Sequence, residues 1–86
     1  MTWLSKHRES ERFASEAEFA KHRGAATEAQ SLYKTAAQAE AEALKLVLPD
    51  KPKTLGVTAV SAVALYFKAH EFELAEELAL ANLVNP

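Results

Sequence analysis

Cysteine is absent from the 86 residues, and glycine and proline are scarce, with two and three residues respectively. The absence of cysteine excludes disulfide scaffolds, thiol chemistry and cysteine-based zinc sites, and it is typical of a reducing compartment. Glycine and proline are the residues that most often end a helix. Their scarcity therefore leaves long uninterrupted stretches, and the few that occur divide the chain into helical segments.

The sequence also lacks the short motifs that mark catalytic and phosphate-binding sites. Neither glycine belongs to a phosphate-binding loop, and neither HExxH nor GxSxG occurs. We therefore expect a protein that is not an enzyme, with no catalytic residues and no cofactor.

Long apolar runs and strongly basic stretches are missing too. The longest apolar run, around AVALYF, is far shorter than the ~20 residues that cross a bilayer. The N-terminal stretch MTWLSKHRESER is charged, which is not typical of a signal peptide. No basic run with interleaved aromatic residues marks a nucleic-acid surface. These features predict a cytoplasmic protein that binds neither membrane nor nucleic acid.

Alanine is the most frequent residue, with eighteen of 86 positions. Apolar residues make up 49%, charged residues 26%, and the net charge is −2, as in an ordinary globular domain. Because alanine has the highest helix propensity, we expect an all-α fold in one domain, residues 1–86. The expected helices cover about residues 3–23, 25–48, 54–69 and 71–84, and the connector covers residues 49–53.

Local signals place the helix ends. Thr2 or Ser10 is expected to cap the first helix, since a hydroxyl can accept a hydrogen bond from the first free backbone N–H groups. Gly24 stands where glycine often follows a helix. Pro49 is expected to end the second helix, and together with Pro52 it makes the connector short and stiff.

The second helix carries an unbroken seam of small residues, spaced alternately by four and three. This spacing is typical of a helix that packs along one face over several turns. The seam comprises Ala25, Ala29, Leu32, Ala36, Ala39, Ala43 and Leu46. We expect it to be buried against large side chains of the neighbouring helices, namely Phe13, Phe19, Tyr66, Phe67 and Phe72.

The segment 54–70 is apolar nearly all round. Its β-branched residues Val57, Val60 and Val63 leave a buried strand as the alternative. The length of the segment and the lack of a partner strand favour a helix. A helix that is apolar on all sides is expected at the centre of the core.

Two stretches resemble tetratricopeptide repeats. In LYFKAHEFELA the matching positions are the aromatic of the first helix, the aromatic after the turn and the small residue of the second helix: Tyr66, Phe72 and Ala75. In GAATEAQSLYKTA they are the turn glycine, the small residues and the later aromatic: Gly24, Ala29, Ala36 and Tyr33. The resemblance covers about two-thirds of the chain and implies two helical hairpins.

The sequence departs from this family in its spacing and its turns. Ala29 and Ala75 lie 46 positions apart, whereas the family repeats about every 34 residues. His70 replaces the turn glycine of the second hairpin. An unrelated four-helix bundle therefore remains the alternative to a repeat-like fold.

The resemblance implies a peptide-binding groove, because the first helix of each hairpin lines such a groove in this family. The groove residues implied by the first hairpin include Glu11, Glu18, Lys21 and His22, and those implied by the second include Val60, Ala64, Phe67 and Lys68. Without the resemblance, the apolar second set is more simply interpreted as core.

Two histidine–glutamate pairs and one tryptophan are further candidates. His7 and Glu11, like Glu18 and His22, are four positions apart, so each pair shares a helix face. We interpret both as solvated charge pairs, with a metal site as the alternative. We expect Trp3 to pack the first helix against the rest of the fold, with contact to a partner as the alternative.

The leading functional hypothesis is a small non-catalytic interaction module that binds a peptide, a partner helix or its own copy. Apolar residues continue to the end of the last helix, LVNP. Either another copy covers them or the chain is part of a longer one. The alternative is a four-helix bundle that carries a small ligand or a metal, which requires an interior pocket beside residues 54–70.

Overall fold

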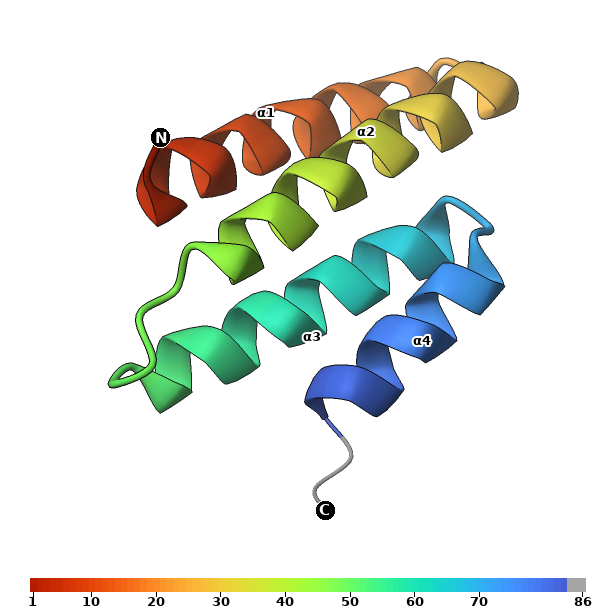
Figure 1. Cartoon of the computed structure of the whole chain (residues 1–86). Coiled ribbons are helices and arrows are strands. Elements are labelled where there is room, and N and C mark those ends of the chain that lie inside the picture. Colours follow the sequence, from red (N-terminus) through yellow and green to blue (C-terminus); the bar gives the residue numbers. More distant parts are fainter. Residues whose placement is uncertain (84–86) are drawn as a thin grey trace.

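The computed structural model describes residues 1–83, which form four α-helices and no strand (Figure 1). The helices are α1 (Trp3–His22), α2 (Ala26–Lys45), α3 (Pro52–Lys68) and α4 (Phe72–Asn82). The all-α prediction is confirmed, and the valine-rich segment is a helix. The expected end of the last helix, at residue 84, lies outside the described residues.

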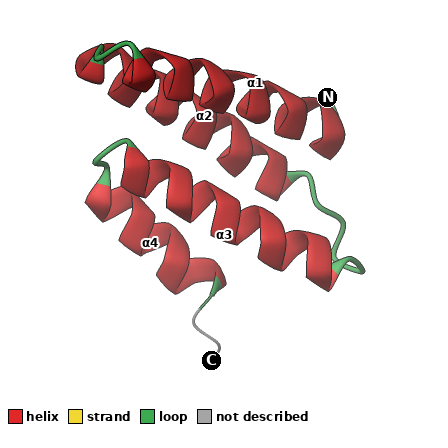
Figure 2. Ribbon diagram, turned by 180° about the vertical axis from the view of Figure 1, so that it is seen from behind, coloured by secondary structure: helices red, strands yellow, loops and turns green. Residues whose placement is uncertain are grey.

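The helices pack in chain order: α1 on α2, α2 on α3 and α3 on α4. Successive helices run antiparallel, and α1 and α4 lie on opposite sides of the α2–α3 pair (Figures 1 and 2). The array is flat, with extents of 41 × 26 × 16 Å. Because α4 packs chiefly against α3, part of the α3–α4 hairpin has no helix covering it.

Helix α1 begins at a capping box. Of the two candidate caps, the structure uses Thr2: its Oγ1 accepts a hydrogen bond from the Ser5 backbone N–H at 3.1 Å. The Thr2 backbone N–H donates in return to Ser5 Oγ at 3.2 Å. Two backbone donors that the helix itself does not satisfy are thereby paired. Ser10 lies inside the helix and is buried.

Helix α1 ends at His22, and Gly24 lies in the turn that leads to α2. Its φ of 80° lies in the left-handed region that glycine enters without steric cost. The Gly24 N–H donates to the Lys21 carbonyl at 3.0 Å, and the Ala25 N–H donates to the Ala20 carbonyl at 2.9 Å. This is the Schellman pattern that satisfies the last carbonyls of a helix.

The turn between α3 and α4 repeats this geometry around a histidine. His70 has a φ of 61°. Its N–H donates to the Phe67 carbonyl at 3.0 Å, and the Glu71 N–H donates to the Tyr66 carbonyl at 2.9 Å. His70 thus occupies the left-handed position that Gly24 occupies in the first turn, at the steric cost of a Cβ atom.

The connector differs from its predicted bounds. Helix α2 ends at Lys45, and the link to α3 covers residues 46–51 rather than 49–53. Pro52 is the first residue of α3 and not part of the connector. Proline suits this position because its fixed φ is helical and its missing N–H has no partner within the helix there.

Small residues dominate the core, and α2 is its central helix. The predicted seam is buried at Ala29, Ala36, Ala39 and Ala43, whereas its last residue, Leu46, is exposed. The core cluster joins α1, α2, α3 and the turn after α3; it comprises Ala17, Ala20, Ala29, Tyr33, Ala36, Ala37, Leu65 and Ala69. Alanine faces alanine here, so the helix backbones approach closely.

The predicted large partners of the seam are only partly correct. Phe13 and Tyr66 pack against the core cluster. Phe19, Phe67 and Phe72 are exposed and do not cover the seam. Instead, the small residues Ala17, Ala20 and Ala69 join the seam residues in the core cluster.

The prediction that α3 is the centre of the core is wrong. The helix buries Thr58, Ala59, Ala62 and Leu65. Its other face is exposed at the large residues Val57, Val60 and Phe67. The narrow, small-residue face allows the closer contact with α2. The bulkier face then remains outside, since α2 and α4 do not surround the helix.

Candidate binding surface

The four candidates on α1 are exposed but do not form one site. Glu11, Glu18, Lys21 and His22 all reach solvent. Glu11 Oε2 lies 3.7 Å from His7 Nε2, near the N-terminal half of the helix. Of the four, Lys21 alone lines a hollow together with residues of α3.

The four candidates on α3 do lie together. Val60, Ala64, Phe67 and Lys68 line one hollow of ≈ 360 Å³ with Val63 and Leu83. Since all four are exposed, their alternative interpretation as core residues is wrong. An open, largely apolar surface therefore lies along this face of α3.

The apolar face of α3 has the spacing of a helix-packing seam. Val57, Val60, Ala64 and Phe67 follow one another at intervals of three, four and three residues, and all are exposed. Val57 is 71% exposed and Phe67 is 62% exposed. Residues with this spacing form one stripe along a helix and normally pack against another helix.

Two further hollows share lining residues with the hollow of ≈ 360 Å³. Near the hairpin turns, a cleft of ≈ 400 Å³ shares Phe67 and Lys68 with it. At the N-terminal end of α3, a hollow of ≈ 410 Å³ shares Val60 and Leu83 with it. We call the continuous surface the α3 groove; it is lined by Lys21, Ala26, Ala29, Gln30, Tyr33, Pro52, Lys53, Gly56, Val57, Val60, Val63, Ala64, Phe67, Lys68, His70, Phe72 and Leu83.

The charged residues of the α3 groove are all basic. Lys21, Lys53 and Lys68 line it, and no aspartate or glutamate does. Within residues 1–83, none of these lysines forms an ion pair. The Nζ atom of Lys68 lies 5.6 Å from the centre of the Tyr33 ring, within range of a cation–π contact. The charged side chains that line the groove are therefore positive, although the chain has a net charge of −2.

A partly buried polar cluster lies outside the groove and joins three helices. The Trp3 Nε1–H donates to Thr58 Oγ1 at 2.9 Å, linking α1 to α3. The Trp3 ring stacks on His7, with ring centres 4.9 Å apart. His7 Nδ1 is hydrogen-bonded to the Glu40 carboxyl group on α2. The expected packing role of Trp3 is confirmed.

Sequence reasoning missed Glu40, which is fully buried. The available signal was its position four residues after Ala36 and four before Leu44, on the buried face of α2. From the sequence, His7 is paired with Glu11, which lies four positions away on the same helix. The closer contact is with Glu40 on another helix, which helical spacing alone does not reveal.

We also searched the described residues for a metal-binding cluster and for a helix that could cross a membrane. Within the described chain, no group of three or more His, Asp or Glu side chains is placed to hold a metal ion. Glu18 and His22 are both exposed on α1. None of the helices in residues 1–83 combines the length and hydropathy needed to cross a membrane.

Two side chains have shifted pKa values. The Glu42 carboxylate, 2.9 Å from Lys6 Nζ, raises the pKa of Lys6, and Glu9 adds to this effect while burial opposes it. Burial raises the pKa of Tyr66, and the negative charge of Glu71 adds to the increase. Neither Lys6 nor Tyr66 lines the α3 groove.

Comparison with known proteins adds no relative to this description. No family model, curated protein or solved structure matches the chain.

Proposed function

We propose that the protein is a non-catalytic interaction module that binds a helix of a partner protein in the α3 groove. The observation that carries the proposal is the exposed seam of Val57, Val60, Ala64 and Phe67. An amphipathic helix buries residues of the same spacing when it lies in such a groove. The flanking lysines favour a partner helix with acidic residues beside its apolar face.

Phe67 is the principal anchor in this proposal. It lines both the ≈ 400 Å³ cleft near the hairpin turns and the ≈ 360 Å³ hollow, and it contacts the Phe72 ring edge-on at a centre distance of 5.0 Å. Complete burial of such a side chain contributes roughly 1.5–3 kcal/mol. Aromatic residues in the middle of an interface commonly contribute most to binding.

The resemblance to tetratricopeptide repeats supports the same surface. In that family the first helix of each hairpin lines the peptide groove, and α3 is the first helix of the second hairpin. The long separation between the two hairpins, 46 residues from Gly24 to His70, sets this chain apart from the family's usual spacing. The proposal therefore rests on the exposed seam, and the resemblance adds to it.

The alternative, a carrier of a small ligand, has one observation in its favour. The cleft near the hairpin turns brings Phe67 and Phe72 together with Lys21 and Lys68, and its volume of ≈ 400 Å³ suits a small acidic molecule. The two functions depend on different residues. A small ligand in this cleft would depend on Lys21 and Phe72, whereas a bound helix would also depend on Val60.

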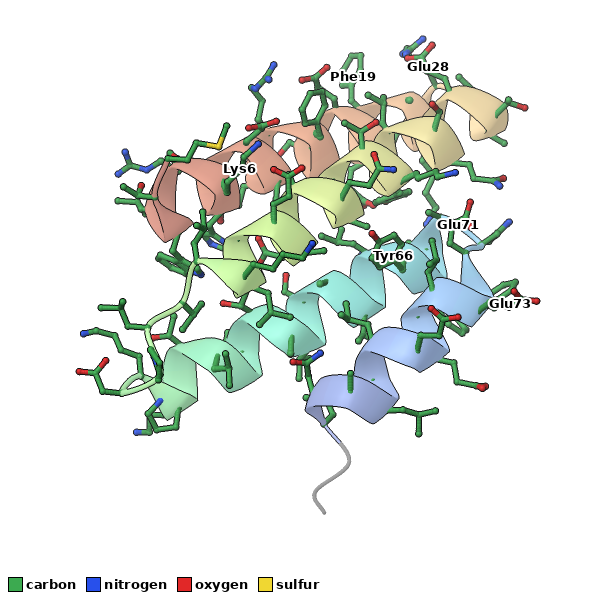
Figure 3. All side chains as sticks on the ribbon, viewed as in Figure 1. Lys6, Phe19, Glu28, Tyr66, Glu71 and Glu73 are labelled. Atoms are coloured by element: carbon green, nitrogen blue, oxygen red, sulfur yellow. The ribbon has the colours of Figure 1, made fainter. Side chains whose placement is uncertain are left out.

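The test is affinity capture with matched variants. Phe67→Glu and Val60→Glu place a charge in the groove. Phe19→Glu is the control, because Phe19 is 66% exposed, close to the 62% of Phe67, but lies on α1 (Figure 3). We expect all three to keep the helical circular dichroism of the unmodified protein. Proteins captured by the unmodified chain and by Phe19→Glu should be lost with both groove variants. Equal capture by every variant would contradict the proposal.

A further inference from the structure

We infer that the helix bound in the α3 groove is α4 of a second copy of this chain. In this arrangement two α3–α4 hairpins pack face to face about a two-fold axis and complete a four-helix bundle. The inference rests on the proposed function, because it names the partner of the same surface. It is carried by the position of α4 beside the groove and by the charges of the two surfaces.

The exposed side of α4 continues the groove surface. Glu76, Leu80 and Leu83 follow at intervals of four and three residues and therefore share one face of the helix. Leu83 lines the groove together with Val60. Leu80 is exposed as well. The hairpin thus presents apolar residues of both helices on one side, as an interface made from two equivalent surfaces requires.

The charges of α3 and α4 are opposite. Every charged residue that lines the groove is a lysine. The charged residues of α4 are all acidic and exposed: Glu73, Glu76 and Glu77. Figure 3 shows Glu73 at the outer edge of the molecule, away from the other helices. One helix of the hairpin therefore complements the other helix of a second copy.

A two-fold axis brings these charges together. For the two hairpins to face one another, the two-fold axis must lie between them and run parallel to the helices. Because α3 and α4 are antiparallel, the N-terminal half of α4 in one copy then lies over the C-terminal half of α3 in the other. Lys68, which lines the groove at that end, then faces Glu73 of the second copy, and the symmetry creates this contact twice. The apolar stripe between the two contacts covers Val60, Ala64 and Leu80 in both copies.

The experiment is a charge exchange followed by sedimentation equilibrium at low ionic strength. Lys68→Glu and Glu73→Lys each place like charges opposite one another, and each should raise the dimer dissociation constant on the order of fivefold. The double variant Lys68→Glu/Glu73→Lys restores opposite charges and should return the constant to within about twofold of the unmodified protein. Phe19→Glu should leave it unchanged, and Phe67→Glu should abolish dimers.

Two outcomes would overturn the inference. One is a strict monomer at the highest concentration that the unmodified protein reaches. The other is a dimer that the double variant weakens as much as the two single variants together. Either result leaves the proposed function separately testable, since loss of a different captured protein with Phe67→Glu but not with Phe19→Glu would still identify the groove as a binding surface.

Discussion

The Nδ1 atom of His7 lies 3.0 and 3.1 Å from the two carboxyl oxygens of Glu40, whose side chain is completely buried. This pair joins α1 to α2 inside a core made largely of alanine. A buried carboxyl group is costly unless it is hydrogen-bonded. His7 therefore determines whether Glu40 is tolerated at the centre of the fold.

Replacement of His7 is expected to destabilise the protein. His7→Phe keeps an aromatic ring for Trp3 to stack on but removes the hydrogen bond to Glu40. The change should lower the free energy of unfolding by about 2 kcal/mol or more, because a buried polar group loses its partner. Urea denaturation followed by circular dichroism measures this loss.

The double variant His7→Phe/Glu40→Met is the control for that prediction. It removes both members of the pair and leaves no buried carboxyl group. It should therefore be more stable than His7→Phe alone, with a coupling energy of about 1 kcal/mol or more. Additive effects of the two substitutions would show that the pair does not act as a unit.

At His70, the left-handed residue of the turn between α3 and α4, we expect glycine to be more stabilising than alanine. His70→Gly removes the steric cost of a Cβ atom at a φ of 61°, whereas His70→Ala keeps it. Both lose the stacking of His70 on Phe72. The glycine variant should exceed the alanine variant in stability by about 1 kcal/mol, as measured by thermal unfolding. Equal stabilities would mean that the turn adopts another conformation in solution.

Alkaline pH is expected to weaken the fold. The pKa values of Lys6 and Tyr66 are raised from 10.5 and 10.0, so the folded state holds these protons more tightly than the unfolded state. Their contribution to stability is complete below those values and is lost as pH rises above them. Urea midpoints measured from pH 8 to 11 should fall at the upper end. The fall should be smaller in Tyr66→Phe, and an unchanged slope would exclude a role for this hydroxyl.

The alanine core is expected to reject larger side chains. Ala36 has no exposed surface and lies in the core cluster between helices. Ala36→Leu should cost about 1–3 kcal/mol through overpacking. Gln38→Leu, at an exposed position of the same helix, is the matched control and should change stability little. A thermal melt of Ala36→Leu that equals the unmodified protein would disprove the close packing of α2.

Local sequence signals predicted most of the fold. The Thr2 cap and the turn at Gly24 depend on residues close in the chain, and both are observed. The buried seam of α2 followed from its spacing, since alanines at intervals of four and three residues all lie on one face of the helix. These features need no knowledge of the neighbouring helices.

The candidate surface was less predictable, because α3 is apolar on nearly every side. Periodicity does not distinguish its inner face from its outer face. The inner face is the one with Ala59 and Ala62, since small residues permit close packing, and this leaves Val60 and Phe67 outside. The pairing of His7 with Glu40 was likewise missed because it joins two helices whose register the sequence alone does not supply.

The central claim is that Phe67 belongs to an open surface and not to the core. Its most direct test compares Phe67→Glu with Leu65→Glu by urea denaturation at a concentration at which the protein is monomeric. Leu65 lies two residues away on the same helix but is buried. Phe67→Glu should change the free energy of unfolding by less than about 1 kcal/mol, whereas Leu65→Glu should unfold the chain or cost several times as much. Comparable losses in the two variants would place Phe67 in the core and contradict the assignment of the α3 groove.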